Sequence, residues 1–75
     1  MPEIFRFYGF SFFFYSKEHE PLHVHLEGKG GCAKFDLIGD NFEMVEKINI
    51  KANDFKRIKE VIDENNDIII NRWNE

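Results

Sequence analysis

Aromatic side chains crowd the first fifteen residues of this chain, and they constrain how so short a sequence can build a core. The segments 3–8 and 10–15 are dense in strand-favouring Phe and Tyr and are separated by Gly9. We expect either a hairpin that turns at Gly9 or one strand kinked there. The chain has 75 residues, nine of them Phe, and each large aromatic side chain buries about 150–250 Å². A single domain with an aromatic core therefore suits this length.

Three further segments have apolar and polar residues in a strand-like order: 23–27, 32–38 and 42–50. The glycine-rich residues 28–31 supply the positive φ angles of a tight connection between the first two, and residues 39–41 form the next turn. Within 32–38, the alternation predicts one face with Ala33, Phe35 and Leu37, and an opposite face with Cys32, Lys34 and Asp36. Within 42–50, it predicts a shared face for Met44, Glu46, Ile48 and Ile50.

The apolar period changes in the last third of the chain. Apolar residues there follow the spacing of an amphipathic helix, at Phe55, Ile58, Val61 and Ile62. Asn53 is a suitable N-cap residue. The polar stretch 65–67 interrupts the pattern and predicts a break with a restart near Asn66. Residues 68–73 would then form a second short helix, although their three consecutive isoleucines also suit a strand.

Together these elements predict an α+β fold in one domain over residues 1–75. We expect a small antiparallel sheet of about four or five strands over residues 3–50, with a C-terminal helical layer over residues 53–74 on one face. The strand at 10–15 has apolar residues on both faces, which predicts an exposed patch that a partner covers.

Charge and cysteine content narrow the class of protein. The net charge of −4 does not favour broad attraction to nucleic acid or to an anionic membrane. Cys32 is the only cysteine, so no intrachain disulfide can form. The aromatic run 7–15 lacks the composition and cleavage site of a signal peptide and is too short to span a bilayer. We therefore expect a soluble, cytoplasmic protein.

All three histidines lie within seven residues, at His19, His23 and His25. His23 and His25 are spaced i, i+2, so they share a strand face and can hold a metal between them. His19 precedes a proline loop that could fold its imidazole back to supply a third nitrogen. The three histidines are therefore candidate ligands for a divalent metal such as zinc. A fourth ligand, or an acceptor for the N–H groups of the ligating histidines, could come from Glu20, Glu27 and Asp36. A structural role, in which the imidazoles cap a loop and pack on aromatics, is an equally good interpretation.

Acid–base chemistry is a further alternative for the same cluster. His23 and His25 can act as acid and base near neutral pH, with a cation to stabilise phosphate charge. Arg6 and Lys34 are the available cations, and Tyr8 is predicted on the same strand face as Arg6. This candidate catalytic set would suit metal-independent RNA cleavage, but a solvated sheet face explains Arg6, Tyr8 and Lys34 more simply.

Four stretches of the sequence form a combined pattern: the start Met1-Pro2-Glu3-Ile4-x-Arg6-Phe7-Tyr8-Gly9, then His19-x-Pro21-x-His23-x-His25, then Ala33-Lys34-Phe35-Asp36, and Trp73. This pattern covers essentially the whole chain and resembles the small bacterial domain-of-unknown-function family 4160. The resemblance implies a stand-alone protein, in some members encoded beside another small domain in a toxin–antitoxin-like arrangement. Glu20 stands where members commonly have a second proline, which loosens that loop. Six residues match positions of the family pattern: Arg6, Tyr8, His19, His23, His25 and Lys34. The resemblance assigns no activity to them.

The sequence supports two hypotheses of function. The first is a protein-interaction module of a two-gene system, which meets a small protein from a neighbouring gene through its aromatic sheet face or its histidine strand. The second is a small histidine-based hydrolase, either metal-dependent or ribonuclease-like. A lone 75-residue sheet offers little concavity for a substrate, whereas a homodimer would create a cleft between its subunits.

Overall fold

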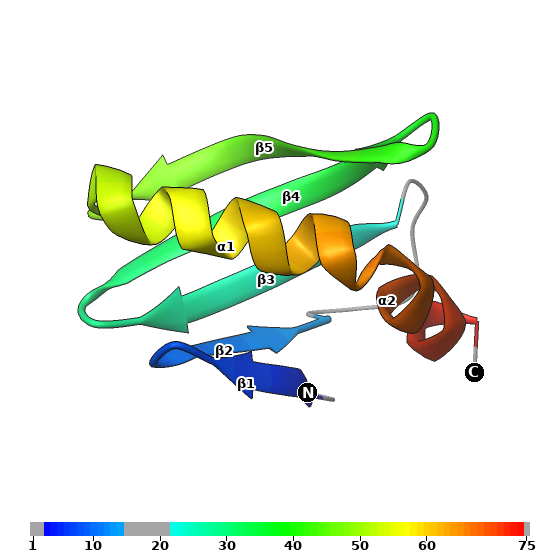
Figure 1. Ribbon diagram of the computed structural model, residues 1–75, viewed down its shortest axis with the longest axis horizontal. Helices are drawn as coiled ribbons and strands as arrows, with labels where there is room; N and C mark the ends of the chain where they lie inside the picture. Colours follow the sequence, from blue (N-terminus) through cyan, green and yellow to red (C-terminus); the bar gives the residue numbers. More distant parts are fainter. Residues whose placement is uncertain (1–2, 15–21, 75) are drawn as a thin grey trace.

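A computed structural model describes residues 3–14 and 22–74 of the chain. These residues form an α+β fold, as predicted, with a five-stranded antiparallel sheet and two C-terminal helices (Figure 1). The elements in chain order are β1 (Glu3–Phe7), β2 (Phe10–Phe13), β3 (His23–Gly28), β4 (Gly31–Ile38), β5 (Asn41–Ile48), α1 (Ala52–Glu64) and α2 (Asn66–Trp73). The predicted loop at 16–21 lies outside the described residues.

The strands lie side by side in the order in which they occur along the chain, β1-β2-β3-β4-β5. The first two form a hairpin that turns at Tyr8 and Gly9, which decides between the two alternatives left open by the sequence. The connection from β3 to β4 turns at Lys29 and Gly30, both with positive φ, as the glycine content of this stretch predicts. Short turns of this kind fix the register of each neighbouring pair.

Both helices lie on one face of the sheet, and the aromatic core lies between the two layers. Figure 1 shows α1 running across the strands and α2 at the end of the sheet. The fully buried side chains include Phe10, Phe12 and Phe35 from the sheet and Ile58, Ile62 and Ile69 from the helices. Neither described helix is long and apolar enough to cross a membrane. Burial of large aromatic rings is what allows so few strands to hold a core.

The helical layer begins earlier than the sequence suggests. The pattern predicts Asn53 as the N-cap, but Lys51 takes that place, with extended backbone angles and no side-chain hydrogen bond to the helix. The prediction is wrong because the Phe55 N–H already donates to the carbonyl of Lys51, which places Asn53 inside the first turn.

The predicted break and restart are both present. The side chain of Asn65 donates to the carbonyl of Val61 at 2.8 Å, and α2 starts at the next residue. The isoleucine run is therefore helical, because Ile69 and Trp73, four residues apart, are both buried against the core.

The alternation predicted for the last strand is wrong. Lys34 lies opposite Glu46, whereas the next residue, Phe35, lies opposite Met44. The register shift leaves Val45 as an extra residue on β5, which is the signature of a β-bulge. Met44 and Glu46 consequently point to opposite faces, and the strand ends at Ile48, before the predicted Ile50.

Candidate functional site

The face of the sheet opposite the helices carries both described histidines. His23 pairs with Asp36, and His25 lies between Phe13 on β2 and Lys34 on β4. Paired residues of antiparallel strands share a face, so the predicted juxtaposition of the two histidines is confirmed. We call this surface the open face; by strand register it contains Glu3, Arg6, Ser11, Phe13, His23, His25, Glu27, Cys32, Lys34, Asp36, Glu43, Glu46 and Ile48.

Four rings form a continuous row along one side of this face. The ring centroids of Phe13 and His25 are 5.8 Å apart and nearly parallel, with 19° between their planes. His25 meets His23 at 5.4 Å, and His23 meets Trp73 of α2 at 5.8 Å. We call these four residues the ring row. Phe13 is only 8% exposed although no helix covers it, so the apolar patch predicted for β2 is covered within the chain by an imidazole.

Charged groups surround the ring row. The open face carries five carboxylates against two cations, Arg6 and Lys34, which gives an excess of three negative charges with neutral histidines. Asp36 lies opposite His23, and its Oδ1 atom is buried without a hydrogen-bond partner among the described residues. A buried carboxylate oxygen of this kind is costly unless a donor reaches it. The open face is thus acidic.

The pKa of His25 lies below its ordinary value of 6.5. Partial burial against Phe13 is the main cause, and the nearby charges of His23 and Lys34 add to it, while Glu46 and Asp36 oppose the shift. Burial and neighbouring cations both disfavour the imidazolium form. At neutral pH His25 is therefore a neutral imidazole, able to accept a proton or a metal ion.

This pKa predicts how stability depends on pH. Because the unfolded chain binds the proton of His25 more readily than the folded chain, the free energy of unfolding is fully retained above about pH 6.5 and decreases as the pH falls below it. We expect the melting temperature to fall between about pH 8 and pH 5.5, measured by circular dichroism. The decline should be shallower in a His25→Gln variant; an unchanged slope would contradict the assignment.

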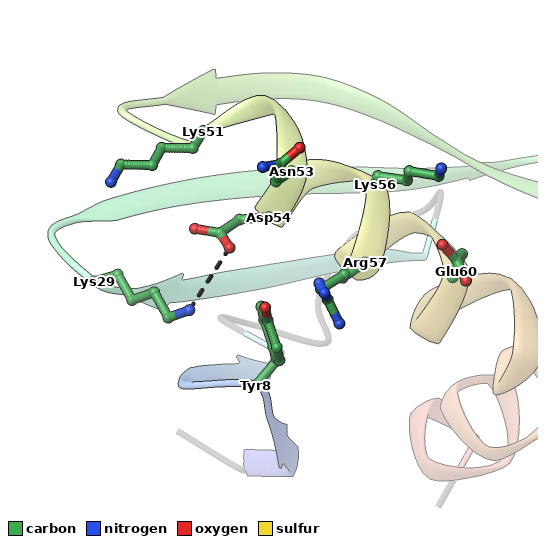
Figure 2. Close-up of a pocket in the computed structure, with 8 residues that line it drawn as sticks. All are labelled: Tyr8, Lys29, Lys51, Asn53, Asp54, Lys56, Arg57 and Glu60. Carbon is green, nitrogen blue, oxygen red and sulfur yellow. Dashed lines mark ion pairs between the residues drawn. The ribbon is translucent and has the colours of Figure 1, made fainter.

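The structure separates the predicted acid–base set. Lys34 is adjacent to His25, as required, but Arg6 lies on the edge strand, where its Nε binds the Glu3 carboxylate at 3.0 Å. Tyr8 is not on the face of Arg6: it follows the end of β1, has a φ of 57°, and its ring lies between Lys29 and Arg57 (Figure 2). The prediction for Tyr8 is wrong because the strand ends one residue earlier.

Metal ligation by three histidines stays a prediction. His19 and Glu20 lie outside the described residues. Among residues 3–14 and 22–74, no three His, Cys, Asp or Glu side chains are placed to hold a metal ion. Of the two predicted additional ligands that the structure describes, Asp36 lies opposite His23, and Glu27 follows His25 on the same face of β3.

Sequence reasoning missed two members of the ring row. Aromatic residues such as Phe13 and Trp73 are expected in the core, and both are indeed only 8% exposed. The contact of Phe13 with His25 depends on strand register, and that of Trp73 with His23 depends on how α2 meets the sheet. In the sequence, the only indication of these contacts is that the segment 10–15 has apolar residues on its second face as well.

Comparison with known proteins identifies the family of the chain. The model of the family described as "Domain of unknown function (DUF4160)" matches residues 9–74, nearly the whole chain. The chain belongs to this family. No curated protein and no solved structure matches it. Membership of the DUF4160 family confirms the resemblance carried by the motifs and brings no activity with it, which leaves the open face as the basis for a function.

Proposed function

We propose that this protein is an interaction module, one half of a toxin–antitoxin-like two-protein system, and that its open face binds a basic surface of the partner. The observation that carries the proposal is the ring row, which runs from Phe13 and the two histidines on the open face to Trp73 of α2 and is bordered by carboxylates. Protein–protein interfaces commonly combine an aromatic centre with a polar rim.

Charge complementarity supports the choice of partner surface. The five carboxylates of the open face outnumber its two cations, so a partner rich in Lys and Arg would be steered towards it. The two-gene arrangement implied by the family pattern supplies the candidate: the small protein encoded beside this chain.

Calorimetry with the purified neighbouring gene product tests the proposal. A Glu46→Lys substitution reverses one charge of the open face, whereas Glu64→Lys makes the same change on an exposed residue at the end of α1. We expect the first variant to weaken the complex about tenfold at low salt, with a smaller loss at high salt. The Glu64→Lys variant should bind like the unmodified chain.

Two results would overturn the interaction module. One is the absence of a complex between the two purified proteins at about 100 µM, since a specific interface binds more tightly than this. The other is a complex that Glu46→Lys and Glu64→Lys weaken equally, because the open face would then have no special part in binding.

A histidine-based hydrolase is the second candidate function, and a specific juxtaposition favours it. His25 is neutral at pH 7, its ring centroid lies 5.4 Å from that of His23, and Lys34 is directly across the strand pair. A base, an acid and a cation are thus close together. Cleavage of a fluorogenic RNA, assayed with and without zinc, would be expected to fall at least about a hundredfold in His25→Gln. No cleavage by the unmodified chain under either condition would rule this candidate out.

A further inference from the structure

A groove opens at the end of the sheet where the first hairpin, the β3–β4 turn and the beginning of α1 meet. Its volume is about 730 Å³, and Figure 2 shows Tyr8, Lys29, Asp54 and Arg57 near one another at its centre, with Lys51 and Lys56 extending towards its two ends. It is lined by Tyr8, Lys29, Lys51, Asn53, Asp54, Lys56, Arg57 and Glu60. None of these residues belongs to the open face, so the groove is a second surface, and a ligand bound there is independent of the proposed function.

The groove is basic in an acidic protein. Four cations and two carboxylates line it, an excess of two positive charges in a chain whose net charge is −4. One of the two carboxylates is already occupied, since Asp54 lies 3.6 Å from the ammonium group of Lys29. Lys51 and Lys56 have no carboxylate within ion-pair distance among the described residues. Two cations of the groove therefore remain unneutralised.

The aromatic ring of Tyr8 holds two more cations in place. The Nζ atom of Lys29 lies 4.2 Å from the ring centroid, and the Cζ atom of Arg57 lies 4.4 Å from it. Figure 2 shows these groups on opposite sides of the ring, where the negative π faces attract them. The faces of Tyr8 are thereby occupied and are not available to stack a base. The ring fixes the positions of charges before any ligand arrives.

Like charges gathered around a hollow repel one another, and an anion bound among them relieves the repulsion. The planar fork of an Arg and the point charge of a Lys both match phosphate oxygens. The volume falls within the range of about 300–1,000 Å³ that is usual for small-molecule sites. A long polyanion is disfavoured by the negative charge of the remaining protein.

We propose that this groove binds a phosphorylated small molecule through its phosphate group. Arg57 contacts the phosphate oxygens, Lys51 and Lys56 attract the anion from the two ends of the groove, and Asn53 and Glu60 are the polar groups that meet hydroxyls of the organic part. Lys29 and Tyr8 act as positioning residues, because they hold Asp54 and Arg57 respectively.

Titration of the ¹⁵N-labelled full chain, followed by NMR, tests the site. The probes are inorganic phosphate, pyrophosphate and ribose 5-phosphate at low ionic strength. We expect saturable amide shifts confined to the groove residues, and binding weakened at least about tenfold in a Lys51→Gln/Lys56→Gln variant. Both side chains are exposed, so the variant should melt at the temperature of the unmodified chain.

The matched control is Lys47→Gln/Lys59→Gln, which removes the same charge from two residues that lie outside both the groove and the open face. This control should retain the original affinity. An equal loss of affinity in the control would show attraction to bulk charge alone and would overturn the site. Amide shifts spread over all basic residues would also overturn it, as would the absence of any shift up to about 20 mM ligand. A short single-stranded RNA that bound about a hundredfold more tightly than ribose 5-phosphate would overturn the small-molecule assignment in favour of nucleic acid.

Discussion

A Phe35→Ala variant is expected to lose a large part of the free energy that keeps this domain folded. Phe35 is fully buried at the centre of β4, and its ring stacks on Phe55 of α1 with the centroids 6.2 Å apart. Truncating a buried Phe costs about 3–5 kcal/mol, whereas a chain of this length has about 4–11 kcal/mol of total stability. Urea denaturation followed by circular dichroism measures the loss directly.

Phe7→Ala is the matched control for this prediction. Phe7 lies on β1 of the same sheet but is 45% exposed, so its truncation leaves little cavity and should cost less than about 1.5 kcal/mol. Equal losses in the two variants would mean that the interface between β4 and α1 does not carry the stability assigned to it.

Gly31→Ala is expected to destabilise the fold by about 1–3 kcal/mol. A Cβ atom at this position would overlap the carbonyl oxygen of Asn49 and lie 2.8 Å from that of Ile48. Backbone atoms cannot rotate away as a side chain does, so the end of β5 must move. The hydrogen bond from the Asn49 side chain to the carbonyl of Gly30, at 2.9 Å, would be disturbed as well.

Gly39→Ala separates this crowding from the general effect of replacing a turn glycine. Gly39 has a positive φ of 65°, but a Cβ atom added to it would have nothing within 4 Å, so only backbone strain of about 1 kcal/mol applies. In NMR spectra, Gly31→Ala should displace the amide resonances of Ile48 and Asn49, while Gly39→Ala leaves them in place. Displacement in both variants, or in neither, would contradict the crowding argument.

The strands and helices could be predicted from the sequence because one face of each element packs on the core and the other face does not. Ala33 and Phe35 alternate with Lys34 because one face of β4 packs on α1 and the other does not. The isoleucine run was ambiguous from sequence alone, since β-branched residues suit strands. Tertiary packing decides it: the segment forms α2, which buries Ile69 and Trp73 against the core.

The parts that could not be predicted depend on contacts between distant residues. The bulge at Val45 arises from the pairing of β5 with β4, and no local sequence pattern in β5 predicts it. Tyr8 leaves the strand because the first hairpin turns there, which carries its ring to Lys29 and Arg57. The histidine pair was visible in the sequence spacing, whereas its contacts with Phe13 and Trp73 required strand register and the position of α2.

The meander order of the sheet also has a consequence for how the chain acquires its structure. Every strand pairs with its neighbour along the sequence, so the sheet can form without the insertion of a strand between two strands that are already paired. Chains dominated by such local pairings fold within about milliseconds, because little loop-closure entropy opposes each step. The helices close much longer loops, and the contact of α2 with β1 joins the two ends of the described chain, where Arg72 donates to the carbonyl of Glu3 at 3.3 Å. The ring row, which includes Trp73 of α2, is therefore complete only once this last helix has docked on the sheet.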